Sequence, residues 1–152
     1  MPIPDHKPSP EQLIRNWQEL LQELRVMQTG VQILTGFLLT VPFSARFETL
    51  ETHQRALYLG VLVGAVLTTC VIVAPVAFHR VLFRRRKRAW LVRMADLCAR
   101  LGLALLGIVS AAVMLLVFDV VVGPVAAWTA AGGVGLVFVV LWFVVPHLAR
   151  RE

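Results

Sequence analysis

Polar side chains interrupt the first apolar stretch of the chain, "ELRVMQTGVQILTGFLLTVPF", and four of them are regularly spaced. Arg25, Gln28, Gln32 and Thr35 follow one another at steps of three, four and three residues, so in a helix they share one face. An amide that is buried in hydrocarbon without a partner costs several kcal/mol. We therefore expect this face to meet protein, through hydrogen bonds between packed helices, or to line a hydrated vestibule that opens to the cytoplasm.

Two other residues are candidates for a proton or cation site. Asp119 is the one carboxylate within an apolar stretch, and His79 ends another such stretch. Each also has a plainer interpretation, Asp119 as a hydrated or helix-capping residue at the membrane boundary and His79 as a boundary anchor beside a basic loop. A coupled antiporter needs an ionisable group near the middle of the membrane, and this chain has none there. Four spans also leave little room for a pathway within one chain, so transport would require an oligomer.

The rest of the sequence has no pattern typical of catalysis or of metal binding. It contains no GxSxG, HExxH, Walker or GxGxxG motif, and its four histidines lack the spacing of metal ligands. Cys70 and Cys98 lie apart in apolar surroundings, where they are expected to pack as small hydrophobic residues. We therefore predict that the protein is not an enzyme and binds neither a cofactor nor a metal.

The elements that carry these residues are four long apolar segments. Of the 152 residues 58% are hydrophobic and 16% are charged, with a mean hydropathy of +0.75. A helix needs about 20 apolar residues to cross a bilayer, and four segments qualify: 26–45, 56–78, 101–122 and 125–145. The prediction is an all-α, polytopic membrane protein with a single four-helix domain over residues 10–148. A flexible cytoplasmic arm, 1–9, would precede it, and a cytoplasmic tail, 149–152, would follow.

Basic residues between the spans predict the orientation. The loop 79–100 is rich in arginine, whereas the other two loops have no excess of basic residues. Because short cytoplasmic loops collect Lys and Arg, both termini should be cytoplasmic. This loop should be helical, either as an extension of the flanking helices or as an interfacial hairpin, and should touch anionic lipid rather than nucleic acid. Its candidate headgroup contacts are Arg84, Arg85, Arg86, Lys87 and Arg88.

The segment before the first span is expected to be an amphipathic helix. Ser9 is a suitable N-cap, Pro10 suits the first helical position, and Glu11 suits the first turn. Apolar residues then recur at alternating steps of four and three: Leu13, Trp17, Leu20, Leu24, Met27, Val31, Leu34 and Leu38. The segment could lie flat on the membrane or stand upright as one helix with the first span, packed on a partner copy or subunit. The unbroken pattern favours the upright helix.

Small residues in the spans favour close packing of the helices. Gly60 and Gly64 have GxxxG spacing in the second span, and Thr68 lies one turn further on. Small residues of this kind allow helix backbones to approach closely. They are therefore candidate helix contacts, within the chain or between copies.

The blocks "ELRVMQTGVQILTGFLLTVPFSARF", "HQRALYL" and "APVAFHRVLFRRRKR" resemble a family of small, uncharacterised, four-span membrane proteins of actinobacteria and their relatives. The resemblance covers roughly residues 15 to 148. It implies a membrane protein of a bacterial host. Some members of that family carry an automatic sodium/proton antiporter label, but the deep carboxylate that such a label requires is absent from this chain.

These observations lead to three functional expectations. The first is a small protein of the bacterial inner membrane that acts through assembly, as a homo-oligomer or as an accessory subunit of a membrane complex. The alternative is a small cation or proton transporter or channel formed between protomers. The second alternative is a protein that binds anionic membrane lipids through its basic loop.

Overall fold

The structure, a computed structural model, describes residues 9–82 and 88–149, and this part of the chain is helical without a strand. Its elements are α1 (Pro10–Thr40), the 3-10 turn η1 (Val41–Phe43), α2 (Ala45–Glu48), α3 (Thr52–Leu82), α4 (Arg88–Val121), α5 (Pro124–Val139), the π-helical turn η2 (Val140–Val144) and α6 (Val145–Ala149). Four stretches are long and apolar enough to cross a membrane: Ile14–Phe43, Thr52–Val81, Trp90–Val121 and Pro124–Ala149. The predicted all-α, polytopic class is therefore confirmed.

α1 is one continuous helix that joins the amphipathic N-terminal segment to the first span. Its start is a capping box, in which the Ser9 hydroxyl accepts from the Gln12 N–H (3.2 Å) and the Gln12 side chain accepts from the Ser9 N–H (2.9 Å). These two bonds satisfy backbone donors that a helix start leaves unpaired. The helix then runs 31 residues without a break, so the N-terminal segment and the first span form one continuous helix.

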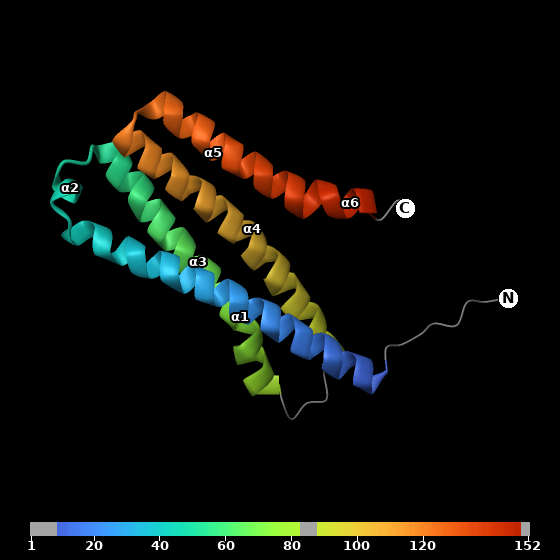
Figure 1. The fold of residues 1–152 in the computed structure, drawn as a ribbon. Coiled ribbons are helices and arrows are strands. Elements are labelled where there is room, and N and C mark those ends of the chain that lie inside the picture. The colour runs from blue at the N-terminus through green and yellow to red at the C-terminus, as the bar shows by residue number, and fades with distance from the viewer. Residues whose placement is uncertain (1–8, 83–87, 150–152) are drawn as a thin grey trace.

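α4 is the central helix of the bundle and packs against α1, α3 and α5 (Figure 1). The core forms two groups along the contacts of α1, α3 and α4. One contains Leu38, Tyr58, Val61, Ala65, Val109 and Leu116, and the other contains Leu24, Val31, Ile72 and Ala99. α5 lies along the opposite side of α4 from α1, so α1 and α5 are the two marginal helices of the bundle.

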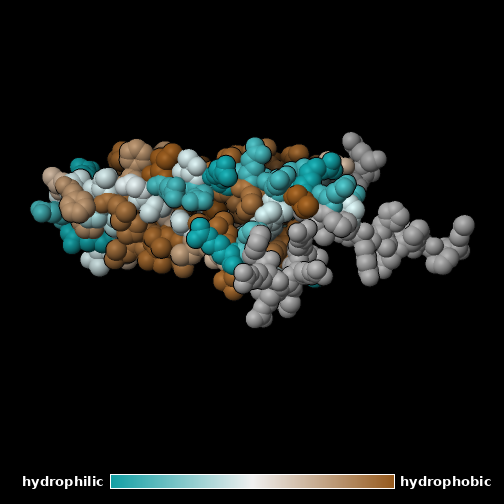
Figure 2. All heavy atoms as spheres, turned by 90° about the horizontal axis from the view of Figure 1, so that it is seen from below, coloured by the Kyte–Doolittle hydropathy of each residue, from teal (hydrophilic) through white to brown (hydrophobic). Residues whose placement is uncertain are grey.

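The bundle has two ends that differ in their residues. One end contains α2 and the turn between α4 and α5, and we call it the Asp119 end (Figure 1). The other end contains the first residues of α1 and the last residues of α6, and we call it the terminal end. Hydrophilic residues gather at the Asp119 end, on the left of Figure 2, and over the right half of that view. A broad hydrophobic area lies between them, as expected for a protein whose middle faces lipid.

The connection between α1 and α3 is packed onto the bundle by one aromatic residue of α3. Tyr58 is 1% exposed, and its hydroxyl donates to the Leu38 carbonyl oxygen of α1 (2.8 Å). The Phe47 ring of α2 meets the Tyr58 ring edge-on at 5.3 Å, and the Arg55 guanidinium lies 5.8 Å from the Phe47 ring centre. A buried tyrosine needs a partner for its hydroxyl, which here fixes the end of α1 to α3.

The last helix widens by one turn before it ends. In η2 the Val145 N–H donates to the Val140 carbonyl oxygen, five residues back. Pro146 follows directly; it has no N–H, and its ring would collide with the carbonyl of residue i−4 in a regular helix. The wider turn removes this collision, which explains why a π-turn lies at this position.

Candidate functional site

The polar residues of α1 divide between two of its faces. Gln28 and Thr35 are half-buried, whereas Arg25 and Gln32 are exposed. The Thr35 hydroxyl donates to the Val31 carbonyl oxygen within the same helix (2.8 Å). Neither Gln28 nor Gln32 hydrogen-bonds to any residue that the structure describes. The Gln32 amide is therefore available to a group outside the folded chain.

The apolar seam of α1 packs inside the chain. Leu24, Val31 and Leu38 are buried, and the other seam members that the structure describes are half-buried. They contact α3 and α4, with Ile72 and Ala99 beside Val31 and with Tyr58 beside Leu38. The heptad-like spacing thus reports packing of α1 on its own bundle, and a partner would have to use the other face of the helix.

The small residues of α3 also divide between the inside and the outside. A Cβ at Gly64 would lie 3.1 Å from Val109 Cγ2 of α4, whereas a Cβ at Gly60 would meet no atom within 4 Å. Thr68 is 0% exposed, and its hydroxyl donates to the Gly64 carbonyl oxygen (2.7 Å). Gly64 therefore serves the contact of α3 with α4, Thr68 is buried in the bundle, and Gly60 faces outward.

α3 and α4 also approach closely at Gly102, a residue that the sequence did not single out. A Cβ at this position would lie 2.7 Å from Ile72 Cγ1. Gly102 has no small partner four residues away to form a GxxxG pair, since Leu106 stands there and Cys98 precedes it. Its position along the helix could have identified it as a contact residue, because Gly102 lies seven residues after Ala95 and so shares a helix face with this buried residue.

Asp119 is the centre of a cluster of polar side chains. Its side chain is 11% exposed, and its Oδ2 accepts from Gln54 Nε2 (2.9 Å) and lies 2.9 Å from His53 Nε2. The other ring nitrogen of His53 lies 3.3 Å from Glu51 Oε2. His53 is thus placed between two carboxylates, and its protonated form could donate to both.

The cluster is built by the start of α3 and the end of α4. The Gln54 side chain accepts from the Glu51 N–H through Oε1 (3.1 Å), so its amide is held while Nε2 points to Asp119. Asp119 does not cap α5, whose N-cap is Gly123 with a φ of 126° and no side-chain bond. Its geometry connects two helices. The sequence did not indicate this pairing, since His53 and Gln54 lie more than sixty residues away from it.

His79 lies far from Asp119. The His79 ring stacks on Trp17 of α1, with ring centres 5.3 Å apart and planes 22° apart. Gln54, which touches Asp119, precedes His79 by 25 residues in α3, a distance of roughly 37 Å along a helix. The two candidate proton or cation residues therefore lie at opposite ends of the bundle and do not form one site.

The basic residues proposed for lipid contact are only partly covered by the structure. Arg84, Arg85, Arg86 and Lys87 lie outside the described residues, and Arg88 is described only as the first residue of α4. Nearby, Arg80, Arg93 and Arg100 are exposed, and Arg100 pairs with Asp96 at 2.9 Å. Among the described residues no group of three or more His, Cys, Asp or Glu side chains could hold a metal ion.

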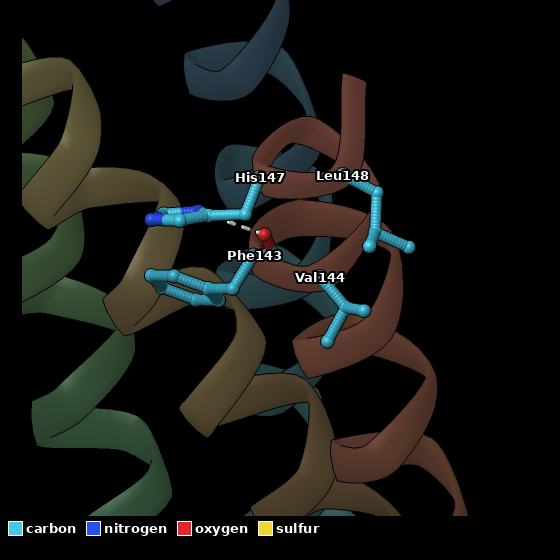
Figure 3. A pocket seen from close by; sticks show the side chains of 4 residues that line it. All are labelled: Phe143, Val144, His147 and Leu148. Atoms are coloured by element: carbon cyan, nitrogen blue, oxygen red, sulfur yellow. Dashed lines mark hydrogen bonds between the residues drawn. The ribbon is translucent and has the colours of Figure 1, made fainter. Parts of the chain in front are cut away.

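A pocket of about 390 Å³ lies against η2 and α6. It is lined by Phe143, Val144, His147 and Leu148, and Figure 3 shows the His147 ring above the Phe143 ring. His147 Nδ1 lies 3.0 Å from the Phe143 carbonyl oxygen in the preceding turn. Three of the four lining side chains are apolar, so this pocket is suited to contact with lipid and lacks the several polar groups of an active site.

Comparison with known proteins identifies a family but no named relative. No curated protein and no solved structure matches this chain. Its residues 6–146 match a family of unknown function (DUF6328). This match includes the first three candidate spans and the fourth as far as Pro146, together with the polar residues of α1 and the Asp119 cluster. The chain is therefore a member of this family of unknown function, DUF6328.

Proposed function

We propose that this protein acts through assembly in the membrane, as a homo-oligomer or as an accessory subunit, with the outward face of α1 as the contact surface. One observation carries the proposal. Gln32 is exposed on the outside of the folded chain, within the stretch Ile14–Phe43 that is apolar enough to cross a membrane.

The depth of Gln32 makes this exposure costly. Arg25 is expected near the boundary of the hydrocarbon, and Gln32 lies seven residues beyond it, about 10 Å deeper along the helix axis. An amide at that depth needs a hydrogen-bonding partner or water. Because the face of α1 that packs on α3 and α4 is apolar, a partner for Gln32 must come from outside the chain. Hydrogen bonds between helices in membranes contribute roughly 0.6 to 2 kcal/mol each.

The proposed location is the bacterial inner membrane, with the terminal end in the cytoplasm. Support comes from the charge of the two ends. Arg80, Arg93 and Arg100 lie at the terminal end, and in the sequence the basic run of residues 84–88 falls between Arg80 and Arg93. At the Asp119 end two arginines are outnumbered by acidic residues: Arg46 and Arg55 against Glu48, Glu51 and Asp119. By the positive-inside rule this difference in charge supports a cytoplasmic terminal end.

The test is a photo-crosslink from Gln32 in native membranes, combined with the mass of the purified protein in a mild detergent. We expect a crosslinked species from position 32, and a purified particle larger than one chain. Position 137 on α5 is the matched control, because Val137 is 55% exposed on a helix face without polar residues. A single chain in detergent, with no crosslink from position 32 in membranes, would overturn the proposal.

A second candidate function is a cation or proton path formed between protomers. The outward polar residues of α1 favour it, because several copies could turn Arg25 and Gln32 toward a shared aqueous path, with the half-buried Gln28 beside them. Against it stands the separation of Asp119 from His79 at the two ends of the bundle. Purified protein in vesicles under a proton or sodium gradient separates the two functions. Flux above that of empty vesicles would favour transport, and assembled protein without flux would favour assembly.

Anionic-lipid binding through the basic run 84–88 is a further proposal, which rests on the sequence. Retained anionic lipid in native mass spectrometry, lost when Arg84, Arg85 and Arg86 are replaced by Gln, is the expected result. Unchanged lipid retention in this variant would contradict it.

A further inference from the structure

α1 carries a second seam on the side that faces away from the bundle. Its members follow one another at steps of four, three, four, three, four and three residues, and all are exposed: Gln18, Gln22, Arg25, Thr29, Gln32, Gly36 and Leu39. We call them the back seam. The apolar seam that packs on α3 and α4 has the same alternating steps, so both faces of α1 repeat every seven residues. Residues at these steps form one continuous strip along a helix, so a second helix can contact the back seam along its length.

We propose that the back seams of two copies of this chain pack against each other in the membrane, as a parallel helix pair about a twofold axis. This inference rests on the proposed function and specifies the partner and the register. Two copies inserted in the same orientation can present the same face to each other only around an axis along the membrane normal. In such a pair each residue near the axis meets its own counterpart.

The chemistry of the back seam suits a contact with itself. The Gln32 amide has both a donor and an acceptor, so two Gln32 side chains can hydrogen-bond to each other. A single polar residue at such a position is known to fix the register of a helix pair. Because Gln32 hydrogen-bonds to no described residue of its own chain, its full hydrogen-bonding capacity remains for the second copy.

Gly36 provides the space for close approach. It lies one turn beyond Gln32 on the back seam, and a Cβ at this position would meet no atom within 4 Å. Its backbone is therefore bare toward the outside, as at the crossing points of paired membrane helices. Thr29 lies on the other side of Gln32, and its hydroxyl donates to the Arg25 carbonyl oxygen (3.0 Å), so it adds little bulk and leaves no unpaired donor.

The charge on the back seam lies where water can reach it. Arg25 is seven residues nearer the terminal end than Gln32, and its long side chain can extend into the headgroup region. Repulsion between two Arg25 side chains is weakened there by water and salt. Gln18 and Gln22 lie beyond Arg25 in the same polar region, so Gln32 is the one amide of the back seam at hydrocarbon depth.

A matched pair of glycine variants tests the contact. Gly36→Leu places a bulky side chain on the back seam, and Gly30→Leu places the same side chain on another exposed face of α1. A Cβ at either glycine meets no atom within 4 Å in the single chain, so both variants should fold. For the full chain in a mild detergent, we expect Gly36→Leu to raise the dimer dissociation constant about tenfold or more. Gly30→Leu should leave it unchanged.

Disulfide formation tests the register. With Cys70 and Cys98 replaced by Ala, single cysteines at Gln32 and at Gly36 should form a disulfide with the same residue of the second copy on oxidation in membranes. Cysteines at Val26 and at Phe37 should not, although these side chains are 71% and 70% exposed on α1. Gln32→Leu should raise the dimer dissociation constant about 3- to 30-fold, by removing the amide pair.

The outcomes separate this inference from the proposed function. A dimer that tolerates Gly36→Leu, or that crosslinks through Val26 or Phe37, would overturn the back-seam contact while leaving assembly in place. A larger particle that contains another protein and gives no disulfide between copies would do the same. A single chain in detergent, without crosslinks in membranes, would overturn both.

Discussion

α1 and α5 are the two marginal helices of the bundle, and they differ in what they show to their surroundings. In the most apolar part of the span Ile14–Phe43, which contains most of α1, only 11% of the residues are buried. In the most apolar part of the span Pro124–Ala149, which begins with α5, none is buried. Apart from two glycines, the exposed residues in the second half of α5 are aliphatic, such as Leu136 and Val137, whereas the exposed face of α1 includes Arg25 and Gln32. Exposure to lipid therefore has different consequences for the two helices. It costs little free energy for an aliphatic side chain but several kcal/mol for an unpaired amide.

The two helices also differ in how they attach to α4. α1 buries Leu24, Val31 and Leu38 against α3 and α4 together. α5 meets α4 where a Cβ at Gly107 would lie 3.2 Å from Trp142 Cζ3 and 3.6 Å from Phe138 Cγ. α1 is thus the better-anchored helix, although its outer face is the more polar one. This combination is expected for a helix with a partner on each side.

The largest effect should follow from giving α5 the chemistry of α1. Leu136 is 64% exposed in the middle of the last span, and Leu136→Gln would place an amide there without a partner. We expect the folded, inserted chain to lose several kcal/mol of stability, or to associate in a new way through α5. Thermal unfolding in a mild detergent and particle mass would measure these effects. Leu136→Met is the control, and equal behaviour of the two variants would mean that α5 does not face lipid.

A smaller effect on the free energy of unfolding should distinguish the face of α1 that packs on the bundle from the face of α5 that contacts lipid. Val31 is 1% exposed and Val137 is 55% exposed, so the same Val→Ala change removes methyl groups from a packed contact or from a lipid contact. We expect Val31→Ala to lower the free energy of unfolding by about 1–3 kcal/mol, through lost contacts and an unfilled space. Val137→Ala should change it by less than about 0.5 kcal/mol. Equal losses would show that α5 has an unseen partner.

The sequence predicts the helices of this protein better than it predicts their contacts. Long apolar segments predict the four spans, and the Ser9 capping signal predicts where α1 begins. Both features depend on residues that are close in the sequence. The seam of α1 also predicts which residues are covered, with Leu24, Val31 and Leu38 buried. It does not identify the covering element, since α3 and α4 provide the same apolar surface as a second copy would.

Contacts between distant residues escaped prediction for the same physical reason. His53 and Gln54 meet Asp119 because α3 begins where α4 ends, which is a property of the bundle and not of any local pattern. Gly102 at the crossing with Ile72 has no GxxxG partner, whereas Gly60, which completes such a motif, faces outward. Spacing gives the face of a helix, and only the packed structure shows what that face meets.

The smallest effect concerns the Asp119 end, where the connection of α1 to α3 is tied to the bundle by side chains and α5 is not. Asp119 holds His53 and Gln54 at 2.9 Å, while α5 follows α4 through a backbone turn in which the Val122 and Gly123 N–H groups donate to the Phe118 carbonyl oxygen. Asp119→Asn keeps the size of the side chain but removes the charge that strengthens both bonds. Because His53 is 61% exposed, we expect a loss of only about 1 kcal/mol.

The location of this loss is more informative than its size. Hydrogen exchange should rise over residues 44–56, which include the start of α3, and should stay unchanged over 124–130, at the start of α5. Asp96→Asn is the matched control, because Asp96 pairs with Arg100 one turn away on an exposed face of α4, a contact worth about 0.5 kcal/mol or less. Faster exchange at the start of α5 in Asp119→Asn would show that the cluster stabilises the attachment of both α1 and α5. The two helices would then differ only in the residues on their outer faces.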